Sequence, residues 1–173
     1  MKNAKADKKT VETQDLKIAV LGKSLVGKSA LTYRFINDRF PTDHDTTIED
    51  QYRINLNIEG VECMLGKILC NTEILDTAGQ DDYQSMLDSW INFADGFILV
   101  YAINDLESFE SLKSRYDRII RNKQGQKVNI ILVGNKCDLV DERKVTEETA
   151  LGVCKEWNVK FMEASALVNL LIT

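Results

Sequence analysis

Apolar positions along the chain fall into short continuous runs and into stretches at helical spacing. Leu16–Leu21 and Gly96–Ala102 are apolar runs typical of buried strands, and Gln51–Ile58 alternates with period two, which indicates a half-buried strand. Between them, Lys28–Asp38 and Leu106–Asn122 place apolar side chains at helical intervals. Strands that alternate with helices predict an α/β fold whose sheet is mostly parallel.

The rest of the chain continues this alternation. A hairpin turning at Glu59-Gly60 leads into a strand that ends at Asp76, and this hairpin makes one edge strand antiparallel. The pattern therefore predicts a mostly parallel six-stranded sheet with one antiparallel edge strand. The remaining expected elements are the helices Asp81–Asn92 and Thr146–Trp157, the second capped by its Thr, and the strands Val128–Val133 and Val159–Glu163.

Composition narrows the class of protein. Residues 1–15 contain four lysines and no apolar periodicity, so we expect a disordered tail followed by one domain over 16–173. The net charge of −5 gives no electrostatic footprint for nucleic acid, and no apolar run approaches the length of a membrane helix. Four dispersed cysteines and a single histidine predict reduced thiols in the cytoplasm and no zinc site.

The first predicted strand runs into a phosphate-binding motif. Gly22–Ser29 (GKSLVGKS) matches G-x-x-x-x-G-K-[ST] between a strand and a helix, and a merely structural turn would not need Lys-Ser there. Backbone N–H groups would surround the β-phosphate, Lys28 would reach the β- and γ-phosphates, and the Ser29 hydroxyl would bind Mg²⁺. The nucleotide contacts expected from this loop are Ser24, Leu25, Val26, Gly27, Lys28, Ser29 and Ala30.

A second motif, DTAGQ, follows the strand that ends at Asp76. Asp76 is placed to bind the metal through water, and Gly79 can offer its backbone N–H to a γ-phosphate. Gln80 then stands where its amide could orient an attacking water. The motif is common by chance, so its weight comes from its position at the end of a strand beside the phosphate loop.

A third segment favours guanine over adenine. Asn135, Lys136 and Asp138 (NKCD) follow a buried strand, at the end of the sheet where such folds bind ligands. A carboxylate at Asp138 can accept both the N1–H and the exocyclic N2–H of guanine, whereas adenine would leave it unpaired. Ser165 and Ala166, after the last predicted strand, could supply a backbone N–H to the base carbonyl.

With these motifs in this order, residues 16–166 resemble the Ras family of small GTPases. The resemblance implies a P-loop NTPase G domain that binds GTP or GDP with Mg²⁺. It implies that Thr47 contacts Mg²⁺ and the γ-phosphate in a first switch, that Phe40 packs against the base, and that 76–83 is a second switch. The effector-binding stretch would be Ile48, Glu49 and Asp50, with an exchange factor and a GTPase-activating protein as further partners.

The chain departs from the family pattern at four places. Ser24 and Leu25 replace paired glycines, and His44 replaces a tyrosine and is interpreted as a solvated loop residue. Gly66–Thr72 lengthens the hairpin by seven residues; it is interpreted either as a longer hairpin loop remote from the phosphates or as a short intron translated in frame. After Ala166 the family's last helix and lipid-accepting cysteine are missing, so we expect the working protein to be longer and this chain to aggregate.

The leading hypothesis is therefore a guanine-nucleotide switch with slow intrinsic GTP hydrolysis, in which Gln80, Lys28 and Thr47 serve the reaction and Ser29, Thr47 and Asp76 serve the metal. It would act in the cytoplasm, or at the cytoplasmic face of a membrane in a longer form. One alternative is a non-hydrolysing pseudo-GTPase, which the intact Gln80, Thr47 and Lys28 disfavour, or an incomplete gene product. A second is a P-loop ATPase or kinase, which NKCD disfavours.

Overall fold

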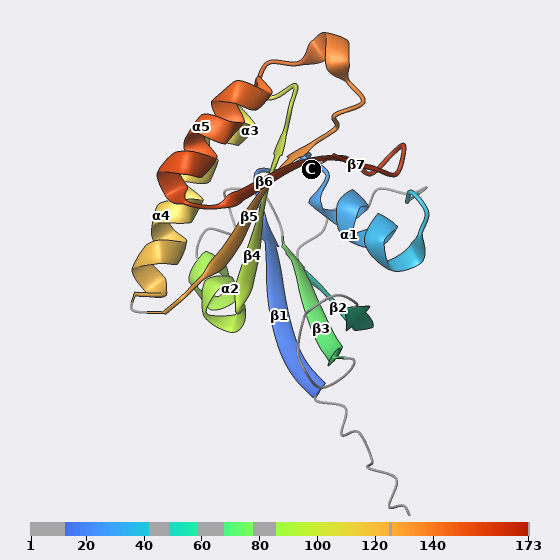
Figure 1. Ribbon diagram of the computed structural model, residues 1–173, viewed down its shortest axis with the longest axis vertical. Coiled ribbons are helices and arrows are strands. Elements are labelled where there is room, and N and C mark those ends of the chain that lie inside the picture. Colours follow the sequence, from blue (N-terminus) through green and yellow to red (C-terminus); the bar gives the residue numbers. More distant parts are fainter. Residues whose placement is uncertain (1–12, 42–48, 59–67, 78–85, 125, 173) are drawn as a thin grey trace, which may run out of the picture.

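A central seven-stranded sheet organises the protein, with strands in the order β2-β3-β1-β4-β5-β6-β7. The computed structural model describes residues 13–41, 49–58, 68–77, 86–124 and 126–172. Figure 1 shows α1 on one face of the sheet and α2 to α5 on the other. The strands are β1 (Thr13–Leu21), β2 (Glu49–Ile58), β3 (Ile68–Thr77), β4 (Gly96–Ala102), β5 (Asn129–Asn135), β6 (Lys160–Ser165) and β7 (Leu170–Ile172).

All six predicted strands are present, and the hairpin of β2 and β3 gives the predicted antiparallel edge. From β3 through β1, β4 and β5 to β6 the neighbouring strands are parallel. The structure adds β7, which pairs antiparallel with β6, so both edges of the sheet carry an antiparallel strand. Asn169 adopts a left-handed conformation (φ 55°), which asparagine tolerates better than most residues, and the chain turns back there into a strand.

Two predicted boundaries on the β2 side of the sheet are wrong for a shared reason. Ile68–Thr72, expected in a hairpin loop, belong to β3, where Ile68 pairs with Ile58 of β2; residues 66 and 67 lie outside the described part. Residues 13–15, expected in the N-terminal tail, belong to β1, where Thr13 pairs with Leu69 of β3. The added residues of β1 and β3 are hydrogen-bond partners of each other. The pattern within one segment does not predict such pairing with a distant segment.

Five α-helices are described, and one of the predictions for them is corrected. The expected single helix over 106–122 is divided at Ser111, where three serine hydroxyls donate to carbonyls three residues earlier: Ser108 to Asp105, Ser111 to Ser108, and Ser114 to Ser111. Serine side chains compete in this way with regular helical hydrogen bonding. The helices are α1 (Lys28–Asn37), α2 (Leu87–Phe93), α3 (Leu106–Glu110), α4 (Leu112–Asn122) and α5 (Glu147–Trp157), with a 3₁₀ turn at Val140–Glu142.

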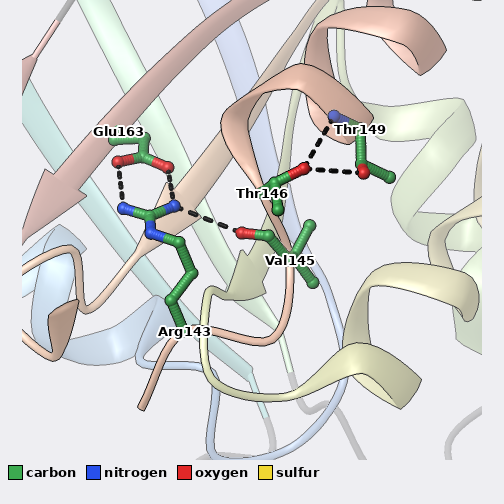
Figure 2. A network of polar contacts seen from close by, with 5 residues as sticks. All are labelled: Arg143, Val145, Thr146, Thr149 and Glu163. Atoms are coloured by element: carbon green, nitrogen blue, oxygen red, sulfur yellow. Dashed lines mark hydrogen bonds and ion pairs between the residues drawn. The ribbon is translucent and has the colours of Figure 1, made fainter. Parts of the chain in front are cut away.

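The start of α2 and the cap of α5 can be compared with their predictions. The expected helix over 81–92 begins at Leu87 within the described residues, and 81–85 lie outside them. Thr146 caps α5 as predicted, because its hydroxyl accepts the backbone N–H of Thr149 at 3.2 Å (Figure 2). None of the helices among the described residues is long and apolar enough to cross a membrane.

The sheet separates two hydrophobic clusters. The larger one packs α2, α4 and α5 against one face, with Trp90, Tyr101 and Leu132 fully or almost fully buried. The smaller one lies on the face covered by α1 and contains Val20 and Val100. Both clusters include residues of the central strands, so the middle of the sheet is packed on both faces. This packing positions the loops at the ends of these strands.

A buried ion pair ties the segment after β5 to β6. The Arg143 guanidinium donates to both carboxylate oxygens of Glu163, at 2.6 and 2.8 Å, and also to the Val145 carbonyl at 3.2 Å (Figure 2). The Glu163 side chain is only 8% exposed, so its charge depends on Arg143 for compensation. This pair fixes the connection between β5 and α5 against the last parallel strand.

Arg143→Met should lower the free energy of unfolding by about 3 kcal/mol, because it leaves the Glu163 carboxylate buried without its cation. Urea denaturation measures this loss. Arg53→Met is the matched control: Arg53 pairs with Glu73 at 3.2 Å, but its side chain is 84% exposed, so its loss should cost less than about 1 kcal/mol. Equal losses in the two variants would contradict the role of the buried pair.

Candidate nucleotide-binding site

The residues singled out in the sequence meet at one end of the sheet. Gly22 follows β1, Asp76 is near the end of β3, Asn135 ends β5 and Ser165 ends β6. Because these strands are parallel, their carboxyl ends lie along the same edge, toward the top of Figure 1. This edge is where open α/β sheets bind their ligands.

The loop between β1 and α1 has the backbone of an anion site. Gly27 precedes α1 with φ 91°, a left-handed conformation that glycine adopts without strain, and none of the described side chains caps the helix. A Cβ at Gly22 would come within 2.2 Å of the Val100 carbonyl oxygen, so the loop passes too close to β4 for a side chain there. The uncapped N–H groups at the start of α1 therefore remain available to phosphate oxygens.

Lys28 is a buried cation within this loop. The residue is only 6% exposed. Its ammonium donates to the Lys23 carbonyl at 3.1 Å, and this bond holds the side chain across the loop. Burial lowers the Lys28 pKa to about 8, the nearby Asp76 carboxylate opposes this shift, and the Arg115 charge adds to it. A phosphate anion beside Lys28 would stabilise its charged form.

Asp76 is fully buried, and neither carboxylate oxygen reaches a hydrogen-bond donor at bonding geometry among the described residues. Burial raises the Asp76 pKa, while the Ser29 hydroxyl and the Lys28 ammonium nearby oppose the rise. A buried carboxylate beside a hydroxyl is an oxygen donor set of the kind Mg²⁺ prefers. The Ser29 hydroxyl and the Asp76 carboxylate therefore fit the chemistry of a magnesium site.

Asn135 joins the base-binding segment to the phosphate loop. Its side-chain amide donates to the Val26 carbonyl at 2.7 Å, and a Cβ at Gly27 would lie 2.3 Å from the same nitrogen. Gly27 is therefore required at this contact for its lack of a side chain as well as for its φ. Lys136 follows in a left-handed conformation (φ 63°), and the backbone N–H of Cys137 donates to the Ala164 carbonyl at 3.1 Å.

The segment after β6 is held beside α1. Ser165 and Ala166 are buried, and the Ser165 hydroxyl accepts the Val168 N–H at 3.2 Å. From α1, Arg34 donates to the carbonyl oxygens of Ala166 and Leu167, at 2.8 and 2.9 Å. Asp138 is partly exposed and follows the turn that Cys137 ties to β6, so its carboxylate is accessible to a ligand at this edge.

The structure therefore brings together 24–30, Asp76, the NKCD segment and 165–166, but it does not describe the whole predicted site. Thr47, Ile48, Gly79 and Gln80, with His44, lie outside the described residues. Glu49 and Asp50 begin β2, and Asp50 stands opposite Asp76 in the strand register, where its charge contributes to the raised Asp76 pKa. Phe40 lies past the end of α1 and is partly buried.

Sequence reasoning missed two contributors to this edge. Arg115 is 7% exposed on α4, and its charge acts on Lys28. The detectable signal was a cation at helical spacing between Leu112 and Ile119, on the apolar face of the helix. Arg34 carried no signal, because its carbonyl partners lie more than 130 residues away along the chain.

Leu25 is the strained position of the phosphate loop. Its φ is 65°, a left-handed conformation that costs a leucine roughly 1 kcal/mol, and its side chain is 87% exposed. Little packing offsets this strain within the described residues. Backbone strain of this kind is common where a loop must hold a ligand-binding shape.

Leu25→Gly should be more stable than Leu25→Ala by about 0.5–1 kcal/mol, because glycine accepts the positive φ and alanine does not. At a position with ordinary φ the order is reversed, since glycine gains more entropy on unfolding. Thermal denaturation measures the stability of the two variants. Because both lack the exposed leucine side chain, their difference reports the effect of the backbone conformation. An alanine variant as stable as the glycine variant would show that the loop is unstrained.

Comparisons with known proteins agree with this geometry. The sequence profile of the Ras family matches residues 17–173. Ras-like protein rasB of Dictyostelium discoideum is 43% identical over 154 residues, which cover 89% of this chain and 75% of that protein. Both the extent of the profile match and this identity place the chain within one group of proteins: it belongs to the Ras family of small GTPases.

Proposed function

We propose that the protein is a guanine-nucleotide-dependent switch that binds GTP or GDP together with Mg²⁺ and hydrolyses GTP slowly. The observation that carries this proposal is the fully buried Asp76 carboxylate, which lies beside the Ser29 hydroxyl and within electrostatic range of the buried Lys28 ammonium. Burying two opposite charges beside an uncapped helix N-terminus costs folding free energy, unless a bound ligand interacts with them. Phosphate and a divalent cation are complementary to both.

Each group at the phosphate end has a separate part in binding. The backbone N–H groups at the start of α1 and the Lys28 ammonium bind and orient the phosphate oxygens. Ser29 and Asp76 hold the metal site, with Thr47 as a further ligand in the nucleotide-bound form. When bound there, Mg²⁺ would supply positive charge beside the phosphate oxygens.

Guanine recognition is assigned to Asp138, supported by the position of NKCD at the carboxyl end of β5. Its carboxylate would accept the N1–H and N2–H of the base, while backbone N–H groups near Ala166 would donate to the base carbonyl. The Asn135 bond to Val26 supports this arrangement, because it joins the base segment to the phosphate loop. Phe40 would pack against the base, and Lys136 would also contact the nucleotide.

Switching and hydrolysis are assigned to residues outside the described part of the chain. Thr47 and Gly79 would hold two loops against the γ-phosphate and release them after hydrolysis, and Gln80 would orient the attacking water. Effector proteins would read this state through Ile48, Glu49 and Asp50. An exchange factor and a GTPase-activating protein would set the rates of nucleotide release and hydrolysis, in the cytoplasm or at its membrane face.

Extraction of nucleotide from the purified protein tests the proposal against its alternatives. Bound GDP or GTP supports the switch, bound ATP indicates an ATPase or kinase, and absence of any nucleotide indicates a scaffold that lost binding. GTP turnover by the same preparation then separates a hydrolysing switch from a non-hydrolysing pseudo-GTPase. The 43% identity to a Ras-like protein favours the first outcome.

Asp138→Asn should weaken GTP binding by at least about tenfold and shift preference toward xanthine nucleotide. The amide oxygen can still accept the N1–H, but the amide NH₂ then faces the exocyclic N2–H of guanine, so a charge-assisted hydrogen bond is lost, whereas xanthine carries a carbonyl acceptor at that position. Competition between GTP and XTP measures the shift. Asp141→Asn removes the same charge from an exposed position in the adjacent 3₁₀ turn and should leave both affinities unchanged. Equal GTP and ATP binding by the unmodified protein would refute the assignment.

Gln80→Leu should slow GTP turnover by roughly tenfold, about 1.4 kcal/mol in the barrier, while nucleotide affinity stays nearly constant. The amide is expected to contact the attacking water in the transition state more than the bound nucleotide. Single-turnover hydrolysis and equilibrium binding separate the two quantities. Gln126→Leu, at an exposed turn, is the control with the same change of side chain. A proportional loss of affinity and rate in Gln80→Leu would contradict this role.

A further inference from the structure

Arg34, in the last turn of α1, is hydrogen-bonded to the turn that follows β6, residues 165–168 (the β6 turn). Its Nε donates to the Ala166 carbonyl at 2.8 Å, and one terminal nitrogen donates to the Leu167 carbonyl at 2.9 Å. The other terminal nitrogen donates at 3.1 Å to the carbonyl of Asp38, the C-cap residue of α1. One side chain therefore ties the end of α1 to two successive peptide groups of the β6 turn.

The β6 turn is also held from within by Ser165. The Ser165 hydroxyl accepts the Val168 N–H at 3.2 Å. This N–H belongs to the same planar peptide group as the Leu167 carbonyl, which Arg34 binds. Both polar groups of that peptide are thus hydrogen-bonded to side chains, and Ala166 beside it is only 4% exposed. The orientation of the turn therefore depends on these two side chains.

The position of the β6 turn connects Arg34 with the proposed nucleotide site. The backbone N–H of Cys137, within NKCD, donates at 3.1 Å to the carbonyl of Ala164, just before the turn. At its other end, α1 begins at Lys28 in the phosphate loop. Arg34 therefore links the helix that starts at the phosphates to the turn beside the base segment. The bond from Asn135 to the phosphate loop is a separate link between the same two regions.

We propose that Arg34 is a positioning residue for guanine recognition, which holds the β6 turn so that its backbone N–H groups meet the C6 carbonyl of the base. The inference rests on the proposed function, because it assigns a bound guanine to this edge of the sheet. Arg34 acts through the carbonyls of Ala166 and Leu167 and is assigned no contact with the ligand. A donor that is already held in place loses less entropy when the base binds, so the nucleotide is released more slowly.

An arginine suits this part because its guanidinium presents several N–H donors in a rigid, planar fork. Here the fork serves three carbonyl oxygens at once. A lysine at position 34 would keep the charge, but its ammonium is a single donor centre on a flexible stem and cannot reproduce this geometry. A methionine would approximate the length of the side chain and lose every donor.

The test measures the rate of GDP release, with Mg²⁺ present, from the unmodified chain, Arg34→Met and Arg121→Met. Arg121 is exposed in the last turn of α4, so its substitution removes the same charge from the same position of another helix. Equilibrium competition then compares GDP with two analogues. Inosine diphosphate lacks the exocyclic amine that Asp138 is proposed to bind, and it keeps the C6 carbonyl. 6-Thioguanosine diphosphate keeps both groups proposed to face Asp138 and replaces the C6 oxygen with sulfur, a poorer acceptor.

In Arg34→Met we expect GDP release to be about tenfold faster, the equivalent of one lost charge-assisted hydrogen bond. The preference for GDP over 6-thioguanosine diphosphate should fall by about threefold, because the N–H groups that read the C6 oxygen are no longer held. The preference for GDP over inosine diphosphate should stay unchanged, since both carry the C6 carbonyl and lose the same contact. Arg121→Met should match the unmodified protein in all three quantities.

Unchanged GDP release, or an unchanged preference over 6-thioguanosine diphosphate, in folded Arg34→Met would overturn the proposal and leave the proposed function standing. Equal falls in both preferences would indicate general loosening of the site and would also overturn it, as would the same changes in Arg121→Met. If Arg34→Met does not fold, Arg34→Lys takes its place, with smaller changes in the same directions. Failure of the unmodified protein to bind GDP would overturn the proposed function and this inference together.

Discussion

The hydrogen bond from the Asn135 amide to the Val26 carbonyl, 2.7 Å long and buried, is the interaction on which the arrangement of the site depends. It joins the end of β5 to the turn between β1 and α1, segments separated by more than 100 residues. Its geometry requires glycine at position 27, because any Cβ there would collide with the amide nitrogen. One contact therefore couples the segment proposed to bind the base with the loop proposed to bind the phosphates, and it explains why position 27 is a glycine.

Two charged groups are buried near this bond. Burial lowers the pKa of Lys28 and raises that of Asp76. Such groups cost folding free energy in the ligand-free chain, and their mutual interactions offset only part of that cost. Their shared edge becomes favourable when an anion and a divalent cation are both present. Ligand binding should therefore contribute substantially to stability, as expected for any group that binds only the folded state.

The fold class and the position of the site could be predicted because each depends on local pattern. Apolar runs marked the buried strands, and a parallel sheet necessarily brings the residues after Leu21, Asp76 and Asn135 to one edge. What could not be predicted depends on partners distant in sequence. The paired extensions at Thr13 and Leu69 stabilise each other, and neither segment alone carries a sufficient strand pattern. The division of the helix at Ser111 likewise follows from serine hydroxyls competing for backbone carbonyls, which hydrophobic spacing does not report.

Arg115 shows the same limit within the site itself. At its place between Leu112 and Ile119, pattern analysis expects an apolar side chain, so a cation there conflicts with the helical face it occupies. Such conflicts between local pattern and chemistry are most often found where a protein binds or reacts. Its guanidinium donates to the Ser111 carbonyl within the helix, whereas its charge acts on Lys28, which lies far from it in the sequence. The effect of this charge on the site therefore depends on the folded arrangement. The sequence alone shows only that a cation occupies an apolar position of the helix.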